Sequence, residues 1–166
     1  MQNKVLVIID VQNNITPNYK LIVKNLNEAI DWALENEIFV CYIKHHNIAP
    51  DATIFVPGSN GAELVPELKI VSENIFVKTE VDVVTSKFFM DFLEQNKINE
   101  VFVTGADATA CVKAACSSLK KSGFDVHVIS DCVTSYDLSK LDEMFSFYKR
   151  AGCDVKCLEE LCRRNK

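Results

Sequence analysis

The stretch from Val101 to Leu119, VFVTGADATACVKAACSSL, constrains the fold more than any other part of the chain. It begins with an apolar run of the kind found in a buried parallel strand, and Gly105 then permits a tight turn. Beyond the turn, apolar side chains recur at the spacing of one helix face: Val112, Ala115, Cys116 and Leu119. The stretch predicts a strand, a tight turn and a helix, with Cys111 in the first helical turn.

Cys111 is a candidate nucleophile because of this place in the chain. The first turn of a helix offers unpaired backbone N–H groups and the positive end of the helix dipole, and both are expected to lower the pKa of a thiol. The same N–H groups can stabilise an oxyanion. The alternative for any single cysteine is a structural role as a small buried hydrophobe, so the interpretation depends on the rest of the chain.

Strand and helix patterns alternate from one end of the chain to the other. Apolar runs predict strands at 5–9, 38–43, 74–78, 98–104, 124–129 and 153–157. Between and after them we expect helices at 19–36, from a cap at Ser86 to 96, from the first turn at Cys111 to Gly123, at 139–151 and from 158 to the end. This alternation predicts parallel strands with right-handed crossovers, in a single α/β domain covering residues 1–166.

Composition and charge exclude several classes of function. The formal net charge of −5 argues against a nucleic acid or an anionic membrane as partner, since both need a basic face. No apolar run is long enough to span a membrane, and the N-terminus lacks the pattern of a signal peptide. Seven cysteines, an odd number, fit reduced thiols in the cytoplasm. Neither the P-loop nor the G-x-G-x-x-G motif is present, so we expect no nucleotide cofactor.

Three reactive side chains occupy equivalent places along the predicted strands. Asp10 follows the first strand, Lys78 ends the third and Cys111 follows the fourth. The carboxyl ends of parallel strands share one edge of the sheet, where open α/β sheets place their sites. A carboxylate can take a thiol proton, an ammonium can hold the charges in place and a thiolate can attack a carbonyl carbon. The alternative for Asp10 alone is a cap on the following turn.

Two groups of residues in the sequence are potential metal ligands. The spacing of Cys153, Cys157 and Cys162 is not the usual C-x2-C, and no histidine is near them. His45 and His46 are neighbours on an extended segment, so their side chains point in opposite directions and rarely bind one ion together. We therefore expect no metal and a surface or substrate-pocket role for the two histidines, with His46 as the pocket candidate.

The chain resembles the isochorismatase-like cysteine hydrolases, a family that includes the nicotinamidases. The segments that carry the resemblance are VLVIIDVQNN, PGSNGAELVPEL, FVKTEVD, VFVTGADATACVKAAC and FDVHVISDCV. The resemblance implies a three-layer α/β/α fold with a six-stranded parallel sheet and a catalytic triad of Asp10, Lys78 and Cys111. It also implies a cis peptide between Ala106 and Asp107, and an oxyanion hole made by the backbone N–H groups of Asp107 and Cys111.

The sequence departs from the family pattern at the expected metal site and before the cysteine. Nicotinamidases bind a metal through an Asp-x-His arrangement after the second strand, whereas residues 44–47 read Lys-His-His-Asn. The usual threonine and acidic residue before the cysteine are replaced by Ala108 and Thr109. We therefore expect a hydrolase that needs no cofactor.

These features predict a cysteine-dependent hydrolase of a small carboxamide that works through a thioester, with Asn13, His46 and Phe88 as pocket candidates. One alternative is isochorismatase-type hydrolysis of a vinyl ether, which need not use a cysteine nucleophile. Another is a binding relative without catalysis, because the motif before Cys111 is atypical. A phospho-receiver domain would need an acceptor aspartate where this chain has Lys78. We expect a small-molecule substrate and a homodimer, since family members are commonly oligomers.

Overall fold

The computed structural model describes residues 3–15 and 17–164. In this part of the chain, six strands form one sheet in the order β3-β2-β1-β4-β5-β6. Every pair of neighbouring strands is parallel. The strands are β1 (Lys4–Ile9), β2 (Phe39–His45), β3 (Ile75–Lys78), β4 (Glu100–Gly105), β5 (Asp125–Val133) and β6 (Asp154–Lys156).

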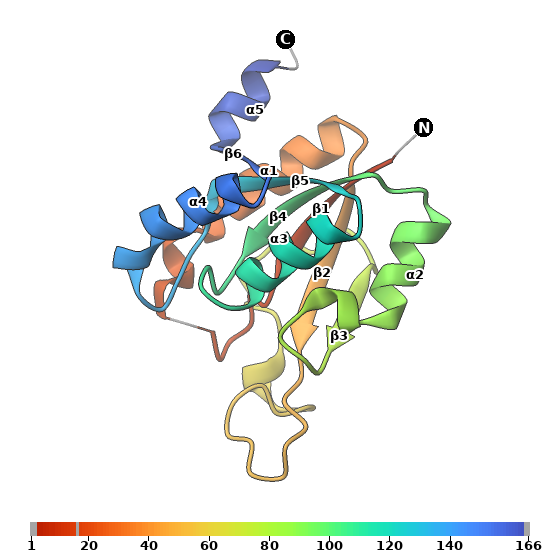
Figure 1. Cartoon of the computed structure of the whole chain (residues 1–166). Helices are drawn as coiled ribbons and strands as arrows, with labels where there is room; N and C mark the ends of the chain where they lie inside the picture. Colours follow the sequence, from red (N-terminus) through yellow and green to blue (C-terminus); the bar gives the residue numbers. More distant parts are fainter. Residues whose placement is uncertain (1–2, 16, 165–166) are drawn as a thin grey trace.

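Helices cover both faces of the sheet (Figure 1). They are α1 (Val23–Glu35), α2 (Lys87–Gln95), α3 (Cys111–Lys121), α4 (Leu141–Arg150) and α5 (Leu158–Arg164). Short 3-10 turns lie at η1 (Pro17–Leu21), η2 (Asn60–Ala62), η3 (Val83–Thr85) and η4 (Leu138–Lys140). Helices α2, α3 and α4 pack on one face, and α1 and α5 pack on the other. The predicted three-layer α/β/α fold with a six-stranded parallel sheet is confirmed.

The two faces have separate cores because side chains alternate along each strand. On β1, Val5 and Val7 face the core under α2, α3 and α4, whereas Leu6 and Ile8 face the core under α1 and α5. All four are fully buried, and each such side chain stabilises the fold by about 1.5–3 kcal/mol. The continuous apolar run at the start of the chain is therefore a central strand buried on both sides.

The strand order reverses between β1 and β4, and the two strands are joined closely at that point. The Thr104 hydroxyl donates a hydrogen bond to the carbonyl of Val7 at 2.9 Å. Gly105 has a φ of 106°, and a Cβ atom there would overlap the backbone of Ile9. Only glycine therefore fits this turn. In parallel α/β sheets the crevice at such a reversal is the usual place for a site.

Several predicted element limits were wrong. The first helix begins at Val23, after the turn η1, instead of at Tyr19. Helix α4 begins at Leu141 instead of Ser139, and β6 is one residue shorter at each end than predicted. Strand β5 continues to Val133 instead of ending at Ile129, and Val133 pairs with Gly105 after an irregularity in the register. Ser86 precedes α2, but its hydroxyl donates to the carbonyl of Val77 and does not cap the helix. Residues 165–166, predicted as helix, lie outside the described residues.

No helix among the described residues is both long and apolar enough to cross a membrane.

Candidate active site

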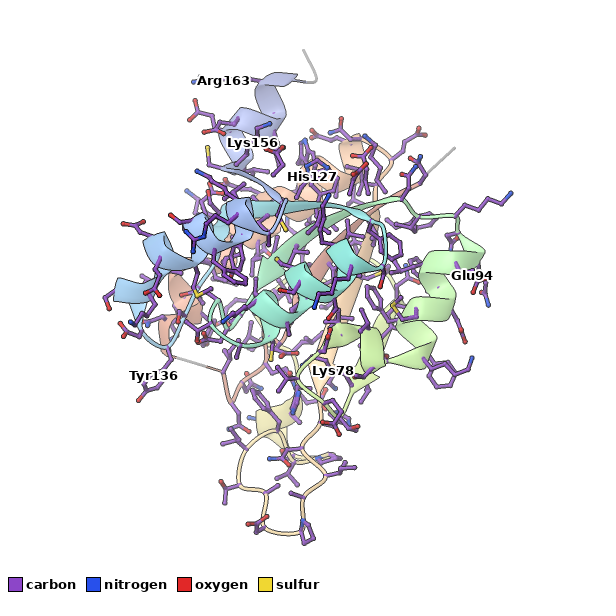
Figure 2. The ribbon with its side chains drawn as sticks, viewed as in Figure 1. Lys78, Glu94, His127, Tyr136, Lys156 and Arg163 are labelled. Atoms are coloured by element: carbon purple, nitrogen blue, oxygen red, sulfur yellow. The ribbon has the colours of Figure 1, made fainter. Side chains whose placement is uncertain are left out.

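The structure brings Asp10, Lys78 and Cys111 together at the carboxyl edge of the sheet. The ammonium nitrogen of Lys78 lies 3.1 Å from Oδ2 of Asp10 and 3.5 Å from the sulfur of Cys111. Lys78 is 2 % exposed and Asp10 is 3 % exposed. Figure 2 shows Lys78 at the lower end of the sheet and His127 at the opposite end. A buried ion pair and a thiol therefore lie in contact at this edge of the sheet.

The backbone positions the acid and the thiol. Asp10 has a φ of 55°, a left-handed conformation that aspartate tolerates better than most residues. The N–H of Asp10 donates a hydrogen bond to the carbonyl of Ile43 on β2 at 3.0 Å. This bond fixes the backbone from which the carboxylate projects. Cys111 is the first residue of α3. At the start of this helix, the N–H of Val112 donates a hydrogen bond to the carbonyl of Asp107 at 3.0 Å.

Burial dominates the electrostatics of the site. It raises the pKa of the Asp10 carboxyl, and the nearby Lys78 and Cys111 side chains only partly oppose it. Burial and the Asp10 carboxylate together raise the pKa of the Cys111 thiol to about 12, whereas Lys78 acts to lower it. The expectation of a thiol with a lowered pKa was therefore wrong. The thiol keeps its proton in the resting site, and a base must remove it.

His45 is a partner of Lys78 that sequence reasoning missed. Its Nδ1 atom lies 2.9 Å from the Lys78 ammonium, and the carbonyl of Glu80 accepts a second hydrogen bond from that ammonium at 3.2 Å. Burial, followed by the charge of Lys78, lowers the pKa of His45 to about 4. The signal that could have found this contact is the strand register, because His45 and Lys78 are direct partners on β2 and β3.

A cavity of about 400 Å³ opens onto the thiol. It is lined by Asp10, Asn14, Ile15, Ile54, Phe55, Asp107, Cys111 and Tyr136. The Oδ1 atom of Asp10 is buried and has no hydrogen-bond partner among the described residues. Tyr136 is 78 % exposed and projects away from the body of the protein at the rim (Figure 2). The cavity is large enough for a small molecule, and its walls are mainly apolar.

The structure does not place the three predicted pocket residues among those that line this cavity. The side chain of Asn13 donates to the carbonyl of Asn60 at 2.8 Å, and its neighbour Asn14 lines the cavity instead. His46 is half-buried, with an Nε2 atom that has no partner among the described residues. Phe88 is 77 % exposed on α2 and borders a separate groove beside β3. Neighbours in an extended segment point to opposite sides, which explains why His45 and not His46 faces Lys78.

The loop between β4 and α3 is held by hydrogen bonds to its neighbours. The peptide bond between Ala106 and Asp107 is cis. The Asp107 carboxylate accepts hydrogen bonds from Thr109, from the Ser135 hydroxyl at 3.0 Å and from the N–H of Tyr136 at 2.6 Å. The backbone N–H groups of Asp107 and Cys111 donate to no other described residue. These two donors, expected from the family resemblance, are therefore free to bind a ligand.

The residues present do not fit a metal ion of the kind that nicotinamidases bind. No group of three or more His, Cys, Asp or Glu side chains is placed to hold an ion anywhere in residues 3–15 and 17–164. The ring nitrogen of His45 that faces the site is already paired with an ammonium group. A metal cation cannot share that nitrogen with Lys78.

Comparisons with known proteins identify the family to which this chain belongs. The family profile described as the Isochorismatase domain matches residues 4–160. The chain therefore belongs to the isochorismatase family. It is 25 % identical over 165 residues to the uncharacterized isochorismatase family protein YrdC of Bacillus subtilis (strain 168), covering 90 % of this chain and 82 % of that protein.

Solved structures share the whole fold. An isochorismatase-like hydrolase from Alkaliphilus metalliredigens superposes with a TM-score of 0.90 at 17 % identity, covering 99 % of this chain and all 100 % of that one. A pyrazinamidase of Pyrococcus horikoshii, solved in complex with zinc, superposes with a TM-score of 0.83 at 19 % identity, covering 94 % and 99 % of the two chains. At these identities the likeness concerns the fold.

Proposed function

We propose that this protein hydrolyses small uncharged carboxamides through a thioester on Cys111. The observation that carries the proposal is the contact of the Lys78 ammonium with both the Asp10 carboxylate and the Cys111 thiol, beside a cavity that the acid and the thiol line. Membership of the isochorismatase family, and the likeness in fold to a pyrazinamidase, whose name denotes an amide hydrolase, support the same class of reaction.

In the first step, Asp10 acts as the general base. Because its carboxyl pKa is raised, it is a stronger base than an exposed aspartate, and it takes the proton of the thiol as the sulfur attacks the amide carbon. The carbonyl oxygen becomes an oxyanion. The free N–H groups of Asp107 and Cys111 donate hydrogen bonds to that oxyanion.

In the second step, the C–N bond breaks and Asp10 returns the proton to the leaving amine. The acyl group is then held as a thioester on Cys111. Asp10 next takes a proton from a water molecule, whose oxygen attacks the thioester carbon. The C–S bond breaks, the thiolate regains a proton, and the carboxylic acid leaves. The ammonium of Lys78 stays charged throughout and offsets negative charge on the acid or on the sulfur.

The charge of the cavity favours uncharged substrates. The carboxylates of Asp10 and Asp107 line it, and no Lys, Arg or His does so among the described residues. Because Lys78 compensates the charge of Asp10, the Asp107 carboxylate is the one that would repel an anionic substrate such as isochorismate. Hydrolysis of the vinyl ether of isochorismate would also leave Cys111 without a role. Amide hydrolysis is therefore the reaction that uses every group the site presents.

The experiment that tests the proposal compares Cys111→Ala with a matched control, Cys162→Ala. We expect Cys111→Ala to lower kcat for an amide by about a thousandfold or more, because no other group can form the thioester. Cys162 is exposed on α5, and its loss should leave kcat unchanged. Both variants should melt within a few degrees of the unaltered protein. Turnover that survives in Cys111→Ala would refute the mechanism.

A further inference from the structure

The Lys78 ammonium has more acceptors around it than it has protons. An ammonium group carries three N–H donors. Four acceptors lie near its nitrogen: Nδ1 of His45 at 2.9 Å, Oδ2 of Asp10 at 3.1 Å, the carbonyl of Glu80 at 3.2 Å and the sulfur of Cys111 at 3.5 Å. The shortest of these contacts is to His45, which the triad does not include.

His45 accepts this hydrogen bond as a neutral imidazole. Since Lys78 can only donate, Nδ1 of His45 must be unprotonated and its proton must lie on Nε2. Burial and then the charge of Lys78 lower the pKa of His45 to about 4, with the neighbouring His46 acting in the same direction and the Glu80 carbonyl opposing them. At neutral pH the imidazole is therefore an uncharged hydrogen-bond acceptor.

The backbone and the ring of His45 are each held by a neighbouring side chain. The fully buried Gln12 accepts a hydrogen bond from the N–H of His45 at 2.8 Å and donates one to its carbonyl at 2.9 Å. The ring lies against Phe55, with centroids 5.6 Å apart. A buried side chain from the segment after β1 thus fixes the backbone of the histidine on β2, and an aromatic neighbour limits the rotation of its ring.

We propose that His45 is a positioning residue of this site, which aims Lys78 at the acid and the thiol. The imidazole accepts a hydrogen bond from one N–H of the ammonium and the Glu80 carbonyl accepts one from a second, so the third N–H lies between Asp10 and Cys111. When the thiol proton moves to Asp10, the negative charge moves from oxygen to sulfur. The third N–H then shifts its hydrogen bond from the Asp10 oxygen to the Cys111 sulfur, over a short distance, while the other two hydrogen bonds of the ammonium stay in place. The proposal rests on the proposed function and adds a fourth member to the site.

Three variants test it. His45→Leu removes the acceptor, and His45→Asn keeps one, because Oδ1 of asparagine can occupy the place of Nδ1. Both variants lose the ring contact with Phe55, so the acceptor is the difference between them. His46→Leu is the control, since His46 does not line the cavity. For each variant, kcat and KM are measured with an amide substrate, and the rate of Cys111 alkylation by iodoacetamide is followed against pH.

We expect His45→Leu to lower kcat about tenfold to a hundredfold, the effect of losing a hydrogen bond to a charged group. KM should stay the same, because His45 does not line the cavity. Lys78 lowers the pKa of the Cys111 thiol, so a misplaced Lys78 should move the alkylation midpoint to higher pH. His45→Asn should restore most of kcat and the original midpoint, and His46→Leu should change neither.

Two outcomes would overturn the positioning role. One is an unchanged kcat and alkylation midpoint in His45→Leu, and the other is a loss in His45→Asn as large as in His45→Leu, which would indicate a role for the ring in packing. Failure of the proposed function is a different result. If no amide is hydrolysed by the unaltered protein, the alkylation profiles of the variants still decide whether His45 acts on the thiol through Lys78.

Discussion

At the scale of single residues, two opposing effects act on Cys111. The start of a helix stabilises a negative charge by up to about 2 kcal/mol, which corresponds to roughly 1.5 pKa units. Burial in a poorly solvated site can shift a pKa by up to about 3–5 units in the opposite direction, and here the Asp10 carboxylate adds to it. Burial therefore outweighs the helix. The thiol becomes reactive only when the acid beside it accepts a proton.

This balance predicts opposite effects of one substitution on two measurements. Asp10→Asn removes the charge that raises the thiol pKa, so the pH midpoint for alkylation of Cys111 should fall. The same change removes the general base, so turnover of an amide should fall by about a hundredfold or more. Peptide mass spectrometry, with Cys162 as an exposed reference, gives the alkylation rates. A midpoint that rises or stays constant would contradict the electrostatic account.

At the scale of elements, the turn from β4 into α3 determines the geometry of the site. The hydroxyl of the buried Tyr148 on α4 donates a hydrogen bond to the carbonyl of Ala108. The Asp107 carboxylate ties the same loop to residues 135–136. These contacts come from two separate parts of the chain, and they hold the segment that carries the two free N–H groups. The loop is therefore built to be rigid where an oxyanion would form.

Gly105 is the residue on which this turn depends most. Gly105→Ala should lower the free energy of unfolding by at least about 2 kcal/mol, since the positive φ alone costs about 1–2 kcal/mol and the new Cβ overlaps the backbone of Ile9. Gly123→Ala is the matched control, because Gly123 also has a positive φ but open space around it. Urea unfolding measures both. Equal losses in the two variants would contradict the role given to the overlap.

At the scale of the whole molecule, the cavity is assembled from segments that are distant in sequence. Ile15 follows β1, Ile54 and Phe55 belong to the long loop after β2, and Tyr136 follows β5. Figure 1 shows this long loop extending from the carboxyl end of the sheet. The sheet thus supplies the reactive groups, and the loops supply the walls.

The expected homodimer remains a prediction, which light scattering can test.

The charge of the assembled cavity predicts its selectivity. An uncharged aromatic or aliphatic carboxamide should be hydrolysed with a higher kcat/KM than the same compound bearing a carboxylate. Lys78 compensates the charge of Asp10, so the Asp107 carboxylate in the cavity wall repels an anion, and a factor of about ten follows from roughly 1.4 kcal/mol of repulsion. Paired substrates of equal size, assayed at several salt concentrations, measure the ratio. A preference for the anionic member of the pair would contradict the inference.

The sequence by itself determined the order of strands and helices, the parallel sheet and the common edge at which Asp10, Lys78 and Cys111 meet. Each of these follows from local patterns: apolar runs, helical periodicity, a glycine turn and the place of a polar residue after a strand. The family resemblance added the cis peptide between Ala106 and Asp107, which the structure contains.

Only the tertiary structure decided which neighbours these residues have. The contact of His45 with Lys78 depends on the pairing of β2 with β3, and the position of Phe88 outside the cavity depends on how α2 packs beside that edge. The direction of the thiol pKa depends on how many atoms from distant segments exclude water from it. Desolvation and side-chain contacts are set by long-range packing, which local sequence patterns do not specify.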